Sequence, residues 1–139
     1  MRHRACGIVL NDDTVLLMYR KNPQNQEYYT IPGGGVEDGE SVNEAVTREM
    51  FEECSLVVKP MKELFVVTRE GVDTHHHILC THISGEPAVH KESPEYLDNL
   101  EGSNLHIPQW VPIRVLKNLT LFPTPAKDKL VEYLTTVQG

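Results

Sequence analysis

The strongest constraint on the fold of this chain is a run of three glycines, residues 33–35, followed closely by an amphipathic helix pattern. Three successive glycines argue against a regular element and let the backbone approach another group closely. Residues 41–54 then place apolar side chains at helical spacing, which gives one apolar face. Ser41 can cap this helix, and Glu44 completes a capping box. The sequence therefore predicts an irregular glycine loop in front of a capped helix.

Three glutamates of this helix, Glu49, Glu52 and Glu53, share one face, because residues three and four positions apart are neighbours on a helix. Three carboxylates within one turn repel one another, so their spacing predicts a divalent cation that holds them together. Oxygen ligands suit magnesium or manganese better than zinc. Arg48 lies four residues before Glu52 and can pair with it. For three glutamates alone, a solvated acidic face is the simpler interpretation.

The stretch from residue 34 to residue 56 resembles the Nudix box, whose pattern is Gly-x5-Glu-x7-Arg-Glu-U-x-Glu-Glu-x-Gly-U, where U is bulky and aliphatic. The fixed positions that match are Gly34, Glu40, Arg48, Glu49, Glu52 and Glu53, and the U positions are Met50 and Leu56. Residue frequencies do not produce a match of this extent by chance. The chain is therefore identified as a member of the Nudix hydrolase family.

Ser55 departs from this pattern, because the family has glycine at that position. The position ends the helix, and we expect it to be the left-handed cap. A serine in that conformation costs about 1 kcal/mol relative to glycine. Ser55→Gly is therefore expected to stabilise the fold by roughly 0.5–1 kcal/mol and to leave the metal ligands untouched.

The resemblance implies an α/β fold, a Nudix-type α/β/α sandwich with a mixed β-sheet, in a single domain over residues 1–139. It also implies a Mg²⁺-dependent pyrophosphohydrolase, with Mn²⁺ as the alternative cation, that cleaves a phosphoanhydride bond in a nucleoside diphosphate linked to another group. The expected substrate is a nucleoside triphosphate, an oxidised nucleotide or a similar small molecule. A Nudix-fold module that senses a nucleotide without turnover is the alternative of a different class.

The resemblance also assigns roles to individual residues. Those implied to bind the metal are Glu49, Glu52 and Glu53 through their carboxylates, and Gly33 through its carbonyl oxygen. Arg48 is expected to orient the carboxylates, and Glu40 to hold the loop to the helix. Gly34 is a structural position of the box.

The base that takes the proton of the attacking water is left open between two places. Glu49 is the first choice within the box. The alternative is a distal acid in the segment before Trp110. The candidates there are Glu95 and Glu101, which rank level, followed by Asp98 and Glu92.

Outside the box, apolar runs and turn residues predict a mixture of strands and helices. The expected elements are a hairpin of residues 5–10 and 14–19 with a three-residue turn, a strand at 28–31, paired strands at 62–69 and 76–83, a strand at 109–115, and a final helix that begins at Thr124. Residues 85–103 are polar, which predicts a long surface segment.

The length of 139 residues and the net charge of −7 limit the classes of partner. The length fits one domain. The acidic balance argues against a nucleic-acid polymer, because phosphate backbones are bound by basic surfaces. A small phosphorylated ligand is still compatible, since a metal ion can supply positive charge locally. No apolar run is long enough to span a bilayer. We expect a small nucleotide-like ligand, no membrane association, and a monomer or homodimer.

Cysteines and histidines give two further expectations. The three cysteines are odd in number and far apart in sequence, so we do not expect a disulfide framework. We expect a cytoplasmic location for the same reason. On a strand, His75 and His77 face the same way and could bind a metal. A polar strand end beside a turn is the favoured interpretation of these histidines.

Overall fold

The computed structural model describes residues 2–89, 94–102 and 104–138. Its elements in chain order are β1 (Arg2–Asn11), β2 (Thr14–Lys21), β3 (Glu27–Thr30), β4 (Gly33–Gly35), α1 (Val42–Cys54), β5 (Val57–Arg69), β6 (Asp73–Ser84), α2 (Pro94–Glu101), β7 (Leu105–Pro112), the 3-10 helix η1 (Ile113–Asn118), β8 (Leu121–Phe122) and α3 (Thr124–Gln138). The expected order of strands and helices is therefore present.

The strands form one eight-stranded sheet in the order β5-β6-β1-β2-β3-β8, with β4 paired to β1 and β7 paired to β2. β1 runs parallel to β6, and β3 runs parallel to β8. The other pairs are antiparallel. The predicted mixed sheet is confirmed.

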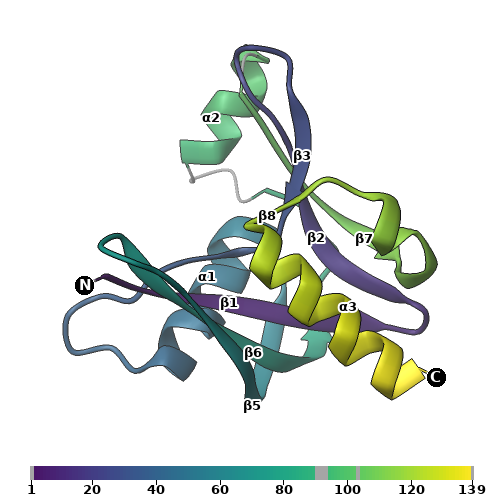
Figure 1. The fold of residues 1–139 in the computed structure, drawn as a ribbon. Coiled ribbons are helices and arrows are strands. Elements are labelled where there is room, and N and C mark those ends of the chain that lie inside the picture. The colour runs from purple at the N-terminus through teal and green to yellow at the C-terminus, as the bar shows by residue number, and fades with distance from the viewer. Residues whose placement is uncertain (1, 90–93, 103, 139) are drawn as a thin grey trace.

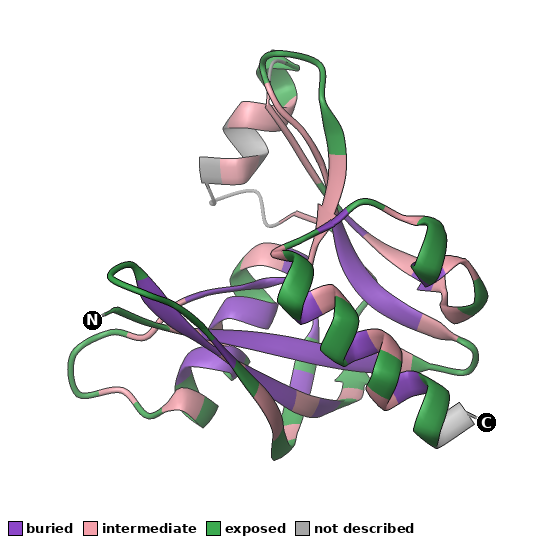
Figure 2. Cartoon of the chain, viewed as in Figure 1, coloured by how far each residue is buried: buried purple, intermediate pink, exposed green. Residues whose placement is uncertain are grey.

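Helices cover both faces of this sheet. Alternate residues of a strand point to opposite faces, so one strand can contribute to two cores. Ala5 and Val9 of β1 pack in the core beneath α1, whereas Cys6 and Ile8 pack in the core that includes Leu130 of α3. α1 and α3 lie on opposite sides of β1, and the buried residues concentrate between them (Figures 1 and 2). The predicted α/β/α sandwich is confirmed.

The hairpin of β1 and β2 is paired only at its tip, where Leu10 lies opposite Val15 and Asn11 opposite Thr14. Two residues separate the strands, and the first of them, Asp12, has a φ of 54°. The predicted three-residue turn is therefore wrong. Beyond the tip, β1 pairs with β4 and β6, whereas β2 pairs with β3 and β7. The two strands diverge, and this divergence opens a cavity between the two halves of the sheet.

The three glycines form the short strand β4, so the prediction that they lack regular structure is wrong. Gly34 lies opposite Ala5, and Gly33 lies opposite Cys6. A β-carbon on Gly33 would collide with the backbone of both β1 residues. Glycine is needed here for close approach, and a strand is the geometry in which that approach satisfies the backbone hydrogen bonds.

The strand predicted at 109–115 begins and ends earlier, as β7 (Leu105–Pro112), and η1 follows it. The difference arises from pairing, because β7 lies along the whole of β2, from Lys21 opposite Leu105 to Thr14 opposite Pro112. At the hairpin tip the chain leaves the sheet, where the Ile113 N–H donates to the Asp13 carbonyl oxygen at 2.9 Å.

The helices begin where the sequence predicted. The Glu44 N–H donates to Ser41 Oγ at 3.0 Å, and the Ser41 N–H donates to Glu44 Oε1 at 2.9 Å, so the capping box is confirmed. α3 begins at Thr124. α2 lies inside the polar segment 85–103. Within the described ranges, no helix is long and apolar enough to cross a membrane.

Ser55 ends α1 in the left-handed conformation, with φ 60° and ψ 26°, as predicted. Its N–H donates to the Phe51 carbonyl oxygen at 3.0 Å. The side chain adds a contact that the sequence did not reveal, because Ser55 Oγ donates to the Ala88 carbonyl oxygen at 2.8 Å. This hydrogen bond offsets part of the backbone strain.

The strain at Ser55 can be separated from its hydrogen bond by two variants that both lack the hydroxyl. Ser55→Ala keeps the strain and loses the hydrogen bond. Its free energy of unfolding should therefore be about 0.5–1.5 kcal/mol lower than that of the wild type. Ser55→Gly loses both and should exceed Ser55→Ala by about 1 kcal/mol, which leaves it within about 0.5 kcal/mol of wild type. Urea unfolding of the three proteins measures these differences. Equal stabilities of the two variants would contradict a strained cap.

Candidate active site

The glutamate face of α1 is directed against the glycine strand. Gly33 N–H donates to Glu53 Oε2 at 3.1 Å. A β-carbon on Gly34 would collide with the Glu49 carboxylate. Glu49 is buried with 9% of its surface exposed, whereas the side chain of Glu52 is 54% exposed. The row of glutamates on α1 therefore runs from the edge of the core into solvent, and β4 lies against the buried end of this row.

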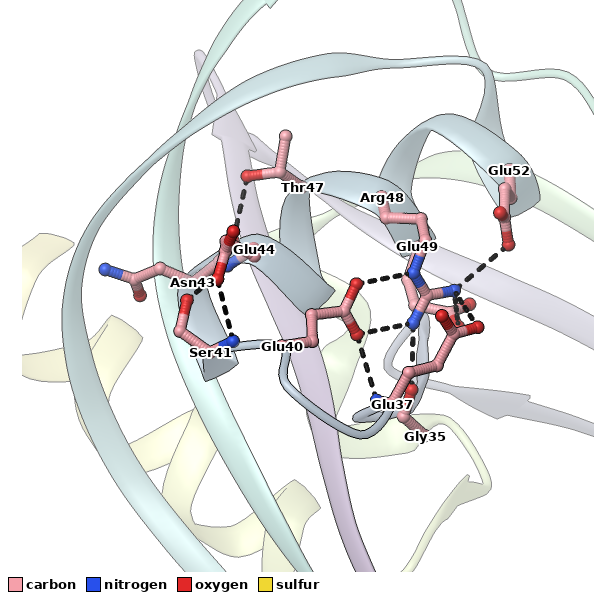
Figure 3. A network of polar contacts seen from close by, with 10 residues as sticks. All are labelled: Gly35, Glu37, Glu40, Ser41, Asn43, Glu44, Thr47, Arg48, Glu49 and Glu52. Atoms are coloured by element: carbon pink, nitrogen blue, oxygen red, sulfur yellow. Dashed lines mark hydrogen bonds and ion pairs between the residues drawn. The ribbon is translucent and has the colours of Figure 1, made fainter.

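Arg48 connects the carboxylates to the glycine strand (Figure 3). Its guanidinium donates to both Glu40 oxygens, from Nε at 2.8 Å and from Nη2 at 2.9 Å. Nη2 also donates to the Gly35 carbonyl oxygen at 2.9 Å. Nη1 donates to Glu49 Oε1 at 2.8 Å and to Glu52 Oε2 at 3.2 Å. One guanidinium thus fixes the orientation of the helix carboxylates relative to β4.

These contacts shift the pKa values of the carboxyl groups in opposite directions. The hydrogen bonds from Arg48, helped by the Glu37 N–H, lower the pKa of Glu40 to about 2. Burial, followed by the charges of Glu49 and Glu95, raises the pKa of Glu53 to about 8. Burial also raises the pKa of Glu49, although Arg48 opposes that shift. Without a cation, Glu49 and Glu53 resist carrying two charges together.

Beside Glu53 lies a cavity of about 580 Å³, between the diverged halves of the sheet. This volume is in the range of small-molecule sites, about 300–1,000 Å³. The chain has a net charge of −7, yet three arginines line this one cavity. The ionisable residues that line it are Arg4, Arg20, Arg69, Cys6, His75, His77, His106, Glu53 and Glu95.

The arginines of the cavity are held in place by local contacts. Arg4 Nη2 donates to the Gly33 carbonyl oxygen at 3.3 Å. Arg20 donates from Nε to the Leu105 carbonyl oxygen at 3.3 Å, and its guanidinium lies 5.7 Å from the centre of the Tyr28 ring. Arg69 makes a bidentate pair with Asp73 at 2.7 and 2.6 Å. These contacts orient the three arginines at the cavity, where Asp73 balances the charge of Arg69.

The distal acids occupy different positions. Glu95 lines the cavity and contributes to the raised pKa of Glu53. Glu101 is exposed at the end of α2. Asp98 Oδ2 lies 3.5 Å from His106 Nε2. Glu92 lies outside the described residues. The structure therefore brings Glu95 to the carboxylate site and leaves Glu101 on the surface.

Asn99 positions α2 beside the cavity. Its Nδ2 donates to the His106 carbonyl oxygen at 2.7 Å, and its Oδ1 accepts from the His106 N–H at 2.7 Å. This pair of hydrogen bonds ties the helix to β7, which fixes the turn of helix that carries Glu95.

The sequence did not point to the arginines of the cavity or to His106. The available signal was the presence of charged residues in apolar strands, such as Arg4 and Arg20 in β1 and β2. His75 and His77 lie near the start of β6, just after a turn, which is where the favoured interpretation placed them. Their burial was not expected, since His77 is only 1% exposed.

The fold and this site define a class, the α/β/α sandwich proteins that carry a carboxylate site on the helix after a glycine strand. Residues 1–134 match the NUDIX domain. The chain belongs to the Nudix family, which confirms the predicted family and its class, a Nudix hydrolase.

Relatives of known sequence or structure agree with this assignment. An ADP-ribose pyrophosphatase of Methanocaldococcus jannaschii is 40% identical over 73 residues, which make up 52% of this chain and 43% of that protein. The aligned part thus spans less than half of the relative. A structure from a study of MutT from Aliivibrio salmonicida and Vibrio cholerae is 24% identical, with a TM-score of 0.72 over 96% of this chain and 95% of that chain. An ADP compounds hydrolase gives a TM-score of 0.70 at 18% identity, over 99% and 75% of the two chains. These structures share the fold.

The raised pKa of Glu53 predicts a pH-dependent stability for the metal-free protein. A carboxyl group with a pKa of 4.5 in the unfolded chain and about 8 in the fold binds its proton more tightly when folded. The contribution of Glu53 to stability should therefore fall as pH rises from about 4.5 to about 8. In chelator at pH 8, Glu53→Gln should unfold with a free energy at least ~1 kcal/mol above wild type, and at pH 4.5 this gain should vanish.

Urea unfolding at both pH values, in the presence of EDTA, measures this effect. Glu52→Gln is the matched control, because that carboxylate is on the same helix but exposed. Its pH dependence should follow that of the wild type. A gain for Glu53→Gln that is the same at both pH values would contradict the burial of an uncompensated carboxylate. The wild-type curve alone does not decide it, because burial lowers the pKa of His77 to about 3 and that shift acts in the opposite direction.

Proposed function

We propose that the protein hydrolyses a phosphoanhydride bond in a small nucleoside diphosphate derivative, with divalent cations bound at the carboxylates of α1. The observation that supports this most directly is the arrangement of Glu53, with Glu49 beside it, at a cavity that three arginines also line. Carboxylates attract cations and arginines attract phosphate oxygens, so the two sets together suit a metal-bound pyrophosphate.

Mg²⁺ fits the donor set, and Mn²⁺ shares its preference for oxygen. The residues proposed to hold it are Glu49, Glu52 and Glu53, through their carboxylates, and Gly33, through its carbonyl oxygen. A β-carbon at residue 34 would collide with the Glu49 carboxylate, so glycine at this position makes room for it. When bound, Mg²⁺ neutralises charge on phosphate oxygens and acidifies a water molecule. Arg48 holds Glu49 and Glu52 in orientation for this role, and Glu40 holds Arg48.

The cavity would hold the rest of the substrate. Arg4, Arg20 and Arg69 provide donors for phosphate oxygens, and the Phe122 side chain lines the same space and offers an apolar surface to a base or sugar. The relative with 40% identity is an ADP-ribose pyrophosphatase, which puts ADP-ribose first among the compounds to test. Nucleoside triphosphates and oxidised nucleotides come next, because they share the diphosphate group.

Glu95 is the residue we propose as the general base. It lines the cavity together with Glu53, so it can accept a proton from a water molecule next to the bound diphosphate. Glu49 is the other candidate, but its carboxylate already accepts a hydrogen bond from Arg48 at 2.8 Å and is one of the proposed metal ligands, so it is less free to take up a proton.

We also propose that the protein acts in the cytosol. Cys6, Cys54 and Cys80 are buried and free. A reducing compartment keeps such thiols from oxidation.

Loss of one charge at the metal site should abolish most of the activity. Glu53→Gln and Glu52→Gln should each lower kcat with ADP-ribose and Mg²⁺ by at least ~100-fold, because each removes a proposed ligand. Glu44→Gln is the control on the same helix, since glutamine preserves the capping box and Glu44 lies in the first turn. Near-normal Mg²⁺-dependent turnover by both variants would show that the metal assignment is wrong.

Wild-type turnover in ¹⁸O-labelled water should place the label in a phosphate-containing product.

The choice of base can be tested with the acids of α2. Glu95→Gln should lower kcat by ~10²–10⁴-fold and leave KM largely unchanged. Glu101→Gln is the matched control, because it removes an equal charge from the exposed end of the same helix. Steady-state kinetics of Glu95→Gln, Glu101→Gln, Asp98→Asn and Glu92→Gln decides the question. Wild-type values for all four would return proton transfer to Glu49.

A further inference from the structure

The parallel pairing of β1 with β6 brings a cysteine and two histidines together on one face of the sheet. Cys6 lies opposite His77, and Arg4 lies opposite His75. Because residues two apart on a strand face the same side, the side chains of His75 and His77 project to the side of Cys6. All three line the cavity beside Glu53. One potential ligand atom of each residue lies within 4.8 Å of those of the other two.

His77 is buried without a hydrogen-bond partner. It is 1% exposed, and neither ring nitrogen has a partner among the described residues. Burial of an unpaired polar group is unfavourable. Phe65 stacks on the imidazole with a centroid distance of 4.5 Å and an interplanar angle of 29°. The ring is therefore held in place while its nitrogens are left available to a ligand.

His75 has the kind of neighbour that metal-binding histidines have. Its Nε2 lies 3.0 Å from Asp73 Oδ1, and Arg69 holds that carboxylate through a bidentate pair. A carboxylate next to a ligating imidazole fixes the tautomer and ring orientation and makes the ligand more basic. Asp73 would thus be the residue that positions His75.

We propose that Cys6, His75 and His77 bind a divalent transition-metal ion of the zinc class in the wall of this cavity. One thiolate and two imidazoles form a soft donor set that suits zinc or cobalt and does not suit magnesium. Three protein ligands leave a fourth position open towards the cavity. The proposal is independent of the proposed function, because none of these residues belongs to the carboxylate set of α1.

Binding requires a proton to leave. The S–H bond of Cys6 breaks, a sulfur–metal bond forms, and the proton goes to solvent. Burial raises the pKa of the Cys6 thiol to about 12, so the sulfur keeps its proton until a cation compensates the thiolate charge. Arg4 favours the thiolate, whereas Glu53 and Asp73 oppose it and would favour the cation. No oxidant or reductant takes part.

Cobalt titration of the metal-free full-length protein tests the site, because a thiolate ligand gives a near-ultraviolet charge-transfer band that oxygen ligands do not give. We expect the band to saturate at one equivalent of Co²⁺ and to disappear when Zn²⁺ displaces Co²⁺. Absence of the band in the wild-type protein would overturn the proposal without bearing on the proposed hydrolase activity.

Variants then assign the ligands. Cys6→Ser should abolish the band, and His77→Gln should weaken Zn²⁺ binding at least ~100-fold. Cys80→Ser is the matched control, because Cys80 is equally buried but packs in the core on the opposite face of the sheet. Glu53→Gln should keep the band while it loses Mg²⁺-dependent turnover. A band that survives in Cys6→Ser, or one that Cys80→Ser removes, would contradict the assignment. If Cys6→Ser does not fold, His77→Gln and the Cys80→Ser control still decide it.

Discussion

Gly34 lies directly against the Glu49 carboxylate, where any β-carbon would collide with it. This contact lets β4 pair with β1 while α1 packs close to the same edge of the sheet. It also brings the Gly33 N–H within 3.1 Å of Glu53. Arg48 fixes the other end of the arrangement, since its guanidinium bridges Gly35, Glu40 and Glu49. The positions of the carboxylates therefore depend on a backbone approach that only glycine permits.

The close approach has an electrostatic consequence. A single guanidinium, that of Arg48, lies within 4 Å of carboxylate oxygens of Glu37, Glu40, Glu49 and Glu52, so its positive charge falls short of the negative charge around it. Among the described residues, Glu53 is not one of the carboxylates that pair with Arg48, and it accepts a hydrogen bond from the Gly33 N–H. Burial, followed by the charge of Glu49, makes its carboxyl group hold its proton tightly. A site with this deficit is stabilised by added cations, as the proposed metal-dependent cleavage would require.

Local sequence was enough to predict the features that depend on neighbours in the chain. The capping box of Ser41 and Glu44 and the left-handed cap at Ser55 follow from residues within one or two turns of the helix. The mixed sheet followed from the family resemblance. Neither the local sequence nor the resemblance predicts the register between strands. The glycine strand was missed because the need for glycine comes from β1, which lies far away in sequence. The arginines of the cavity were missed for the same reason, since all eight strands, together with α1 and α2, bring its walls together.

The pairing register has a further effect, because it places hard and soft ligands around the same cavity. Glu53 offers oxygen to cations such as magnesium, whereas Cys6 and His77 offer sulfur and nitrogen to ions of the zinc class. Ligand chemistry can therefore keep two kinds of cation apart over a short distance. Their charges still act on each other, since an ion at Cys6 would favour the ionised form of Glu53, which burial and the charges of Glu49 and Glu95 oppose. Occupation of the soft site would thus lower the pKa of the carboxyl group that the hard cation needs in its ionised form.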